Sequence, residues 1–344
     1  MTRNKTLRTI TLPTMTAAIL ATSGLAVAQE PIEIDMPAPT WDRWMYPFNA
    51  TPCTRPGGSV FGFWSEDLES STDNRMGQVV FGFDTTGQLA PGQTAGMRVT
   101  SAVITMTQQN EGVVYDPTVD PYECMLDTPL IEDEDAGQPV ELFGVDYRGG
   151  YDQETWPCNG PFSPSGGSWG SRYIFNAGYR DGVLSDVSNQ IREEWTPTPF
   201  AVSVPEGVAA GDVIPLDTVH TFTIDVDDQD IQGYLLDGLE RGEIEFGLST
   251  MYRVESQTGT FASFYMKENA LVEFGIVSPA TLQLTLEEDI ASDPCDLNGD
   301  GSVGGADLAK LLAVWGSDDD EADFDGDNVV GGSDLAVLLG CWDS

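Results

Sequence analysis

Two carboxylate-rich loops near the C-terminus carry the sharpest chemical pattern in the sequence. DLNGDGSVGGAD begins at Asp296 and DFDGDNVVGGSD begins at Asp323, an offset of 323 − 296 = 27 residues. Oxygen ligands fall at loop positions 1, 3, 5, 7 and 12: Asp296, Asn298, Asp300, Ser302 and Asp307, then Asp323, Asp325, Asp327, Val329 and Asp334. Position 7 offers a backbone carbonyl and the others offer side chains. Because alternate residues of a tight loop turn toward one point, each loop predicts one calcium ion as a cofactor.

Calcium suits these loops better than magnesium. A shell of six or seven oxygens is within reach, whereas Mg²⁺ prefers fewer protein ligands in a stricter octahedron. Position 9 is Gly304 or Gly331, so water would complete each shell. Position 6, where the loop turns sharply, is Gly301 in the first loop and Asn328 in the second. Asn enters the left-handed backbone region more readily than most residues, so both loops can make this turn.

An apolar segment follows each loop, LAKLLAVWG and then LAVLLGCW, and no amphipathic helix precedes the first loop. The Asp at position 12 replaces the Glu that ends a generic EF-hand loop. Two loop–helix units without entering helices resemble the type I dockerin. One unit cannot bury its apolar face alone, so we expect the two to pack together. The expected contacts join Leu308, Leu311, Leu312 and Trp315 to Leu335, Leu338, Leu339 and Trp342.

The dockerin resemblance implies a calcium-folded module that attaches a secreted protein to a cohesin-like or other surface receptor, here through residues 291–344. In that family, recognition residues commonly occupy loop positions 10 and 11, often as Ser-Thr. Here these positions are Gly305-Ala306 and Gly332-Ser333, so an ordinary cellulosomal cohesin is not the expected partner. The flanking Cys295 and Cys341 resemble the GC-type dockerin-like tails of exported planctomycete proteins, although Cys341 precedes the closing Trp342 instead of following it.

The N-terminus has the pattern of a signal peptide. A basic region with Arg3, Lys5 and Arg8 precedes an apolar stretch, and Ala26-Val27-Ala28 supplies the small residues that signal peptidase requires. We therefore expect cleavage after Ala28 and a secreted, extracellular or cell-surface protein without a membrane span. Removing residues 1–28 takes away three of the 15 basic residues and leaves a formal charge of 12 − 56 = −44. So acidic a protein is not expected to bind nucleic acid.

The rest of the chain predicts a mainly β fold. Alternating apolar residues occur at Val79-Phe81-Phe83, Phe222-Ile224-Val226, Ile244-Phe246-Leu248 and Leu282-Leu284-Leu286, and a β-branched run begins at Val99. Such alternation is typical of antiparallel strands with one face buried and one exposed. We expect a jelly-roll-like β-sandwich over 29–290, interrupted by a long loop insert at about 109–215, and a small all-α dockerin-like domain over 291–344.

Two helices are expected in the body. From Asp228 to Arg241, the residues Ile231, Tyr234, Leu235 and Leu239 share one face, and Gly242 can end the helix. A weaker helical pattern runs from Ser185 to Trp195. The stretches RMGQVVFGFDTTGQ and MRVTSAVITMT, followed later by ATLQLTLEE, resemble DNRLRE-type β-sandwich modules. That resemblance implies a carbohydrate-binding or surface role, and it does not cover the insert.

The five cysteines predict disulfides, since export permits oxidation. A bridge from Cys295 to Cys341 would enclose the C-terminal module and stabilise it by about 4 kcal/mol in the chain-entropy model. A bridge between Cys124 and Cys158 would order the insert, which leaves Cys53 buried or paired in another arrangement.

No catalytic motif stands out. The single histidine, His220, is expected at the edge of a strand, and having one histidine argues against a Ser-His-Asp apparatus. We therefore expect a non-catalytic surface or binding protein. The alternatives are a polysaccharide-degrading enzyme with a carboxylate pair and a purely structural envelope protein. Acids considered for such a pair are Asp73, Asp84, Asp146 and Glu255, and aromatic residues considered for sugar stacking are Tyr151, Trp156, Phe162, Trp169 and Tyr173.

Overall fold

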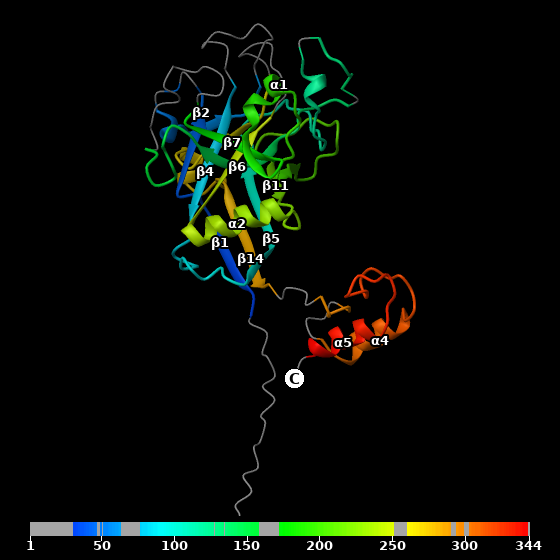
Figure 1. Cartoon of the computed structure of the whole chain (residues 1–344). Coiled ribbons are helices and arrows are strands. Elements are labelled where there is room, and N and C mark those ends of the chain that lie inside the picture. The colour runs from blue at the N-terminus through cyan, green and yellow to red at the C-terminus, as the bar shows by residue number, and fades with distance from the viewer. Residues whose placement is uncertain are drawn as a thin grey trace, which may run out of the picture. The chain divides into compact units, whose positions relative to one another are not determined.

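A computed structural model of the chain describes residues 30–46, 49, 51–62, 76–126, 128–133, 135–157, 172–250, 260–289, 294–298 and 303–342. The expected signal peptide lies outside these residues. The chain divides into two compact units between Asp289 and Ile290. We call Gln29–Asp289 the body and Ile290–Ser344 the tail, and each is described by itself (Figure 1). No helix within the described ranges is long and apolar enough to cross a membrane.

The body is mainly β, and its named strands pair antiparallel throughout. One sheet has five strands in the order β1 (Ile32–Met36), β14 (Thr281–Glu288), β5 (Met97–Thr107), β11 (Val219–Thr223) and β10 (Val204–Pro205). The long pairing of β14 with β5 holds this sheet together and places Leu284 opposite Ala102. The expected one-sided burial is found in β14, where Leu282, Leu284 and Leu286 are buried and Gln283 is exposed.

A second sheet has seven strands and receives most of its width from the insert. Its order is β2 (Trp41–Met45), β4 (Gln78–Asp84), β12 (Glu243–Ser249), β6 (Glu141–Tyr147), β7 (Ile174–Arg180) and β8 (Val183–Asp186), with β9 (Ala201–Val202) paired to β6. A separate two-stranded ribbon joins β3 (Gly57–Ser59) to β13 (Ser263–Tyr265). Phe81 and Phe246 from the seven-stranded sheet and Ile104 and Leu284 from the five-stranded sheet belong to one core cluster.

The prediction of a loop insert at 109–215 was wrong, because four strands of the second sheet and β10 of the first lie within it. Two of them, β6 and β7, lack a period-two pattern because both of their faces are covered. Five consecutive residues are buried in β6, and five in β7. Strands buried on both faces carry continuous apolar or small residues in place of alternation. For the same reason β4 and β12 are buried on both faces, contrary to the one-sided exposure expected.

The expected helix near Asp228 is confirmed as α2 (Gln229–Arg241). The Asp228 carboxylate accepts hydrogen bonds from Asp230 N and Ile231 N, and Gly242 ends the helix in the left-handed conformation at φ 84°. Buried residues on one face pack α2 against β12 and β5. The helix expected over Ser185–Trp195 is mostly wrong: β8 and a 3-10 turn, η3 (Val187–Asn189), precede a single turn, α1 (Gln190–Glu193).

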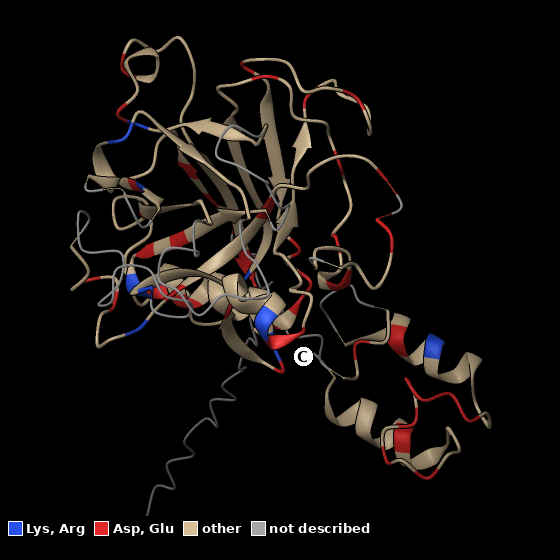
Figure 2. Ribbon diagram, turned by 90° about the horizontal axis from the view of Figure 1, so that it is seen from above, with Lys and Arg blue, Asp and Glu red and all other residues tan. Residues whose placement is uncertain are grey.

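The remaining helical segments are short. The body contains η1 (Pro52–Thr54), η2 (Tyr122–Cys124) and α3 (Ala270–Glu273), and the tail contains α4 (Gly305–Ala313) and α5 (Gly332–Gly340). Acidic side chains occur over both units, whereas Lys and Arg are few and scattered (Figure 2). In the sequence of the tail, Lys310 is the one basic residue.

Candidate metal centre in the tail and candidate pocket in the body

The second acidic loop brings three of its predicted ligands together. One carboxylate oxygen from each of Asp323, Asp325 and Asp327 lies within 4.8 Å of the other two. The loop backbone is wrapped around Asp323, whose Oδ1 accepts a hydrogen bond from Gly326 N at 2.9 Å and whose Oδ2 accepts one from Asn328 N at 2.7 Å. Asn328 adopts φ 66°, the left-handed turn that was expected at position 6. Three carboxylates held this close repel one another unless a cation lies among them.

The position-12 carboxylates occupy equivalent places in the two loops. Asp307 accepts hydrogen bonds from Asn298 N at 3.0 Å and from Gly304 N at 2.7 Å. Asp334 accepts hydrogen bonds from Asp325 N at 3.2 Å and from Gly331 N at 2.7 Å. Both side chains are almost fully buried. Each carboxylate therefore links positions 3 and 9 of its loop and also caps the helix that follows.

These backbone donors favour the charged form of both carboxylates. The bonds from Gly331 and Asp325 lower the pKa of Asp334, against a smaller opposing effect of burial. For Asp307, burial acts to raise the pKa, but the hydrogen bonds from Gly304 and Asn298 outweigh it and the pKa is lowered. An ionised carboxylate at position 12 is the form that a calcium ion requires.

The other predicted ligands have the following positions. Asp296 and Asn298 lie at the start of the first loop, whereas Asp300 and Ser302 are outside the described residues. Val329 follows the second loop's turn with an exposed side chain, and its N–H donates to Asp327 Oδ1 at 2.8 Å. The glycines at position 9 have matching backbones, with φ −153° and ψ −154° at Gly304 and φ −149° and ψ −153° at Gly331. The described parts of the two loops thus share geometry as well as sequence.

The tail has a small core that differs from the expected one. Fully buried residues are Cys295, Val303, Leu311, Ala322, Val330 and Leu338, and Leu308 and Leu335 pack against them in part. The prediction for the other four residues was wrong: Leu312 is 52 % exposed, Trp315 47 %, Leu339 54 % and Trp342 38 %. Trp315 and Trp342 lie beyond the last residues of α4 and α5, so they do not continue the buried face of either helix.

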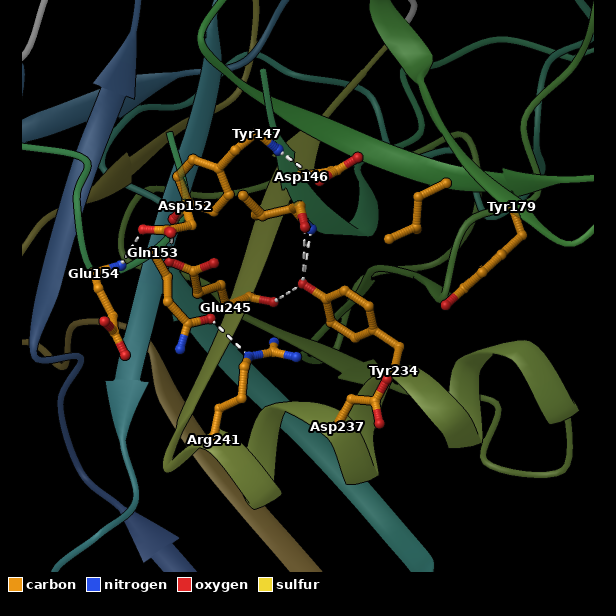
Figure 3. Close-up of a pocket in the computed structure, with 12 residues that line it drawn as sticks. Asp146, Tyr147, Asp152, Gln153, Glu154, Tyr179, Tyr234, Asp237, Arg241 and Glu245 are labelled. Atoms are coloured by element: carbon orange, nitrogen blue, oxygen red, sulfur yellow. Dashed lines mark hydrogen bonds between the residues drawn. The ribbon is translucent and has the colours of Figure 1, made fainter. Parts of the chain in front are cut away.

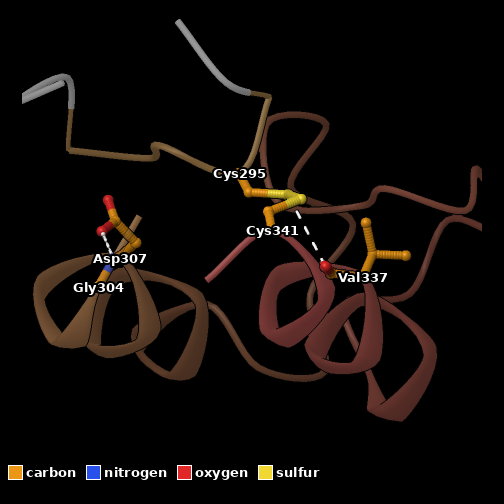
Figure 4. Close-up of a disulfide and its surroundings, with 5 residues drawn as sticks. All are labelled: Cys295, Gly304, Asp307, Val337 and Cys341. Atoms are coloured by element: carbon orange, nitrogen blue, oxygen red, sulfur yellow. Dashed lines mark hydrogen bonds between the residues drawn. A yellow bond between two sulfur atoms is a disulfide. The ribbon is translucent and has the colours of Figure 1, made fainter. Parts of the chain in front are cut away.

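The expected Cys295–Cys341 disulfide is confirmed, with Cα atoms 6.3 Å apart (Figure 4). In the repeat, Cys295 corresponds to Ala322 and Cys341 corresponds to Val314, and both of these residues belong to the tail's apolar cluster. The chain itself connects Val314 to Ala322, whereas the disulfide joins the equivalent positions at the open ends of the repeat. The bridge therefore closes the paired units covalently.

The cysteine arrangement of the body differs from the favoured one. Cys124 is a free thiol, so the bridge considered between Cys124 and Cys158 is wrong. Cys53 is disulfide-bonded, and its partner lies outside the described residues. Sequence spacing could not reveal this, because Cys124 was grouped with Cys158 only by their shared position in the insert.

The body contains a cavity of about 410 Å³ lined by strands of the seven-stranded sheet and by α2 (Figure 3). Its lining comes from β6, the loop after it, β7, β8, α2 and β12: Val145, Asp146, Tyr147, Asp152, Gln153, Glu154, Tyr179, Leu184, Tyr234, Asp237, Arg241 and Glu245. Five of these residues are acids and three are tyrosines. This combination of aromatic and polar groups suits a polar ligand with apolar faces, such as a sugar.

Glu245 is the most perturbed acid of this cavity. Its side chain is 3 % exposed, and its carboxyl accepts a hydrogen bond from the Tyr147 hydroxyl. Burial raises the pKa of Glu245 to about 8, although the hydrogen bond from Tyr147 acts in the opposite direction. The Glu245 carboxyl is therefore protonated in the folded protein at neutral pH.

Tyr234 and Arg241 fix the α2 side of the cavity. The Tyr234 hydroxyl donates to the Glu245 carbonyl oxygen at 2.8 Å and accepts from Val145 N at 2.8 Å, so it ties β12 to β6 (Figure 3). Arg241 Nε donates to Gln153 Oε1 at 2.9 Å. Asp146, one of the acids considered from sequence, also lines this cavity, and burial raises its pKa.

Sequence reasoning missed the rest of this cavity. Glu245 alternates with Ile244 and Phe246, which predicts a solvent-facing residue, and only the unrecognised strands of the insert make it buried. Of the other acids considered, Asp84 is exposed and accepts hydrogen bonds from Thr86 N at 3.0 Å and Thr86 Oγ1 at 2.5 Å. Asp73 and Glu255 lie outside the described residues.

Three of the aromatic residues considered for sugar stacking pack against one another. Tyr151 meets Trp156 edge to face with ring centroids 4.7 Å apart, and Tyr173 lies 4.9 Å from Tyr151. Trp156 is 8 % exposed and Arg43 lies over its ring, so this group anchors the insert and offers no flat platform. Phe162 and Trp169 are outside the described residues.

His220 lies near the start of a strand, β11, as expected, but it is fully buried there, and β11 lies between β5 and β10. Its Nε2 lies 3.1 Å from Gln108 Oε1, and its ring meets Phe264 edge to face. Burial lowers the pKa of His220 to about 4, so the ring is neutral at physiological pH. This environment indicates a packing role.

Comparison with known proteins gives no match: none of the family models, curated proteins or solved structures matches this chain. The function therefore has to be inferred from the geometry of the loops and the cavity.

Proposed function

We propose that the chain is an exported protein whose tail binds two calcium ions and attaches the body to a receptor on a scaffold or cell surface. The body, which we propose to be a jelly-roll-like β-sandwich, would present the cavity beside Glu245 to a carbohydrate ligand without catalysing a reaction. One observation carries the proposal for the tail. Asp307 and Asp334 make equivalent pairs of hydrogen bonds to positions 3 and 9 of the two repeated loops.

Two kinds of support favour calcium. The clustered oxygens of Asp323, Asp325 and Asp327 are hard ligands with the alternate spacing that a calcium loop uses. The tail's small apolar core is also too limited to stabilise so acidic a segment on its own, and a bound ion adds its binding free energy to folding. In this proposal, Asp296, Asn298, Asp300 and Asp307 serve the first ion.

Exposed apolar residues support attachment. Leu312 and Trp315 correspond by the repeat to Leu339 and Trp342, and all four are more than one-third exposed on an otherwise acidic unit. Buried aromatic and aliphatic anchors commonly dominate binding at protein interfaces. A receptor that covers these four residues would bury apolar surface that stays exposed on the tail alone.

Attachment can be tested with the tail fused to an inert carrier and incubated with cell envelopes of the source organism. We expect retention in calcium, release by chelator, and at least about tenfold weaker retention after Leu312→Ser plus Leu339→Ser. Asp318→Ser, which changes an exposed residue outside both loops and both helices, is the matched control. Retention that ignores both chelator and the paired leucine change would overturn the attachment proposal.

A second function is favoured by one specific observation, the burial of Glu245 in an acid-lined cavity, which raises the pKa of its carboxyl to about 8. A glycosidase needs a proton-donating carboxylic acid opposite a second, ionised carboxylate. Glu245 would be the acid, and Asp146 or Asp237 would be the carboxylate. Release of reducing sugar from a polysaccharide panel, lost in Glu245→Gln and kept in Glu243→Gln, would establish this enzyme. Binding of the same glycan without release would favour the non-catalytic function.

A further inference from the structure

A second acidic cluster lies in the body, in the part of the insert that precedes β6. One carboxylate oxygen from each of Asp116, Asp120 and Asp135 lies within 4.8 Å of the other two. Unlike the loops of the tail, this cluster is largely buried: Asp116 is 1 % exposed and Asp120 is 7 %, while Asp135 is exposed. The three residues come from separate turns of one loop, so the fold, and not a local sequence motif, brings them together.

Hydrogen bonds satisfy only one side of this cluster. Asp116 Oδ1 accepts from Thr118 N at 2.8 Å and from Thr118 Oγ1 at 2.6 Å, and the same hydroxyl lies 3.0 Å from Asp135 Oδ2. Asp116 Oδ2 is buried and has no hydrogen-bond partner among the described residues. A buried carboxylate oxygen without a donor is costly, which requires either a proton or a cation beside it.

Glu141 gives an independent observation that points to a ligand. It is the first residue of β6, its side chain is 3 % exposed, and its buried Oε2 finds no hydrogen-bond partner in the described part of the chain. The pKa of Glu141 is raised to about 8. Burial is the largest cause, and the charges of Asp120 and Asp116 add to its effect. The Glu141 carboxyl therefore lies close enough to feel the charges of the cluster, and it offers a possible fourth carboxylate from a different element of the fold.

The charged neighbours of these carboxyl groups are themselves acids. Besides burial, the groups that raise the pKa of Asp120 to about 7 are Asp133, Asp116 and Asp135. The pKa of Asp116 is raised chiefly by burial, and the nearby charge that adds to this effect is that of Asp135. Four carboxyl groups surrounded by acidic neighbours form an oxygen-rich environment of strongly negative potential.

We propose that Asp116, Asp120, Asp135 and Glu141 bind one calcium ion within the body, separate from the two proposed for the tail. Carboxylate oxygens are the ligands that hard divalent cations prefer, and a partly exposed site accepts the remaining waters of a calcium shell. The ion would fasten the loop of 116–135 to the start of β6. Because β6 pairs with β12, it would also stabilise the sheet that carries Glu245.

This site does not depend on the proposed function of the tail, and the two can be tested separately in the full chain. Asp296→Ala plus Asp323→Ala removes the first calcium ligand of each tail loop, and we call this variant the tail-silenced chain. Equilibrium dialysis then counts the calcium ions bound to each variant. We expect one ion to remain in this tail-silenced chain and to be lost after the further change Asp116→Asn plus Glu141→Gln. The matched control is Asp212→Asn, because Asp212 is exposed and its carbonyl accepts from Tyr115 N at 2.9 Å, next to the cluster.

A second variant guards against loss of folding. Asp135 is exposed, so Asp135→Asn should fold normally and weaken calcium binding by about tenfold or more, since ligand charge sets the affinity of such sites. Near-ultraviolet circular dichroism in chelator checks the fold of each variant. A tail-silenced chain that binds no calcium, or that binds it equally well after Asp135→Asn, would overturn the proposal. A tail that binds no calcium while the body still binds one ion would overturn only the proposal for the tail.

Discussion

Glu245 and Asp84 show how the surroundings of an acid decide its chemistry. Both belong to paired strands, β12 and β4, whose register places Glu243 opposite Asp84. Asp84 lies exposed at the strand end, where hydrogen bonds from Thr86 lower its pKa. Glu245 lies two residues further along β12, where strands of the insert cover it. Burial there raises the pKa of Glu245 to about 8. The chemical role of an acidic residue therefore cannot be predicted until the elements that pack over it are known.

The raised pKa of Glu245 gives a prediction about stability. The folded protein holds a neutral carboxyl, whereas the unfolded chain ionises near the ordinary glutamate pKa of 4.5. The stabilisation is therefore complete below about pH 4.5 and is lost as the pH rises toward about 8. Glu245→Gln keeps an acceptor for Tyr147 and cannot ionise. We expect this variant to be more stable than the parent by up to about 3 kcal/mol at pH 8 and equal to it near pH 4.

Urea unfolding of the full chain at the two pH values measures this difference. Glu243→Gln is the control, because Glu243 starts the same strand and is only half-buried. Equal effects of Glu245→Gln at pH 4 and pH 8 would contradict a protonated Glu245 in the folded body.

At the scale of elements, α2 and the two tail helices differ in how far sequence predicts them. The limits of α2 follow from Asp228 and Gly242, which are local capping signals. The buried face of α4 and α5 is harder to predict. Leu311 and Leu338 are fully buried while their neighbours Leu312 and Leu339 are half exposed. A nine-residue helix has room for few core contacts, and the apolar pattern alone does not tell which leucines make them.

Two glycines of α2 make a matched test of its C-terminal cap. Gly242 has φ 84°, and a Cβ there would lie 2.5 Å from Thr86 Cγ2, so Gly242→Ala should destabilise the body by about 2 kcal/mol. Gly233 is exposed inside the helix with open space where a Cβ would lie, so Gly233→Ala should stabilise it by about 1 kcal/mol. Thermal unfolding measures both. Equal effects of the two substitutions would show that α2 does not end as described.

Adjacent leucines of α5 make a similar test of the tail core. Leu338→Ala should lower the stability of the calcium-loaded tail by about 3 kcal/mol, because Leu338 is 0 % exposed in the tail core. Leu339→Ala should change it by no more than about 0.5 kcal/mol, because Leu339 is 54 % exposed. Calorimetry of the isolated tail compares them. A larger loss from Leu339→Ala would place the core on the wrong face of α5.

At the scale of the whole molecule, the sequence predicts the class of fold. It predicts less well which strands cover the second sheet. The mainly β body follows from period-two runs such as Leu282-Leu284-Leu286, because those strands keep one face open. The same pattern does not reveal β6 and β7, because both faces of each strand are buried. Segments rich in Gly and Pro also separate these strands along the sequence. Since these strands cover the second sheet, the cavity beside Glu245 and the acid cluster around Asp116 could not be predicted either.

The candidate calcium loops of the tail are predictable because all their ligands lie within twelve consecutive residues. The Asp323 loop needs no distant element to bring its carboxylates together. The cluster of Asp116, Asp120 and Asp135 has no such spacing, and Glu141, the fourth ligand that we propose, belongs to another element, β6. Local chemistry is visible in a sequence, whereas chemistry assembled by packing requires the fold.

The most direct test of the calcium binding proposed for the tail is a calcium titration of residues 290–344 followed by far-ultraviolet circular dichroism. We expect helicity to rise as two ions bind, to be reversed by chelator, and to be lost after Asp296→Ala plus Asp323→Ala. The matched control is Asp318→Ala, which removes an acid outside both loops. A segment that is equally helical without calcium, or whose helicity ignores the two loop substitutions, would contradict calcium-dependent folding and leave the tail as a disulfide-closed pair of helices.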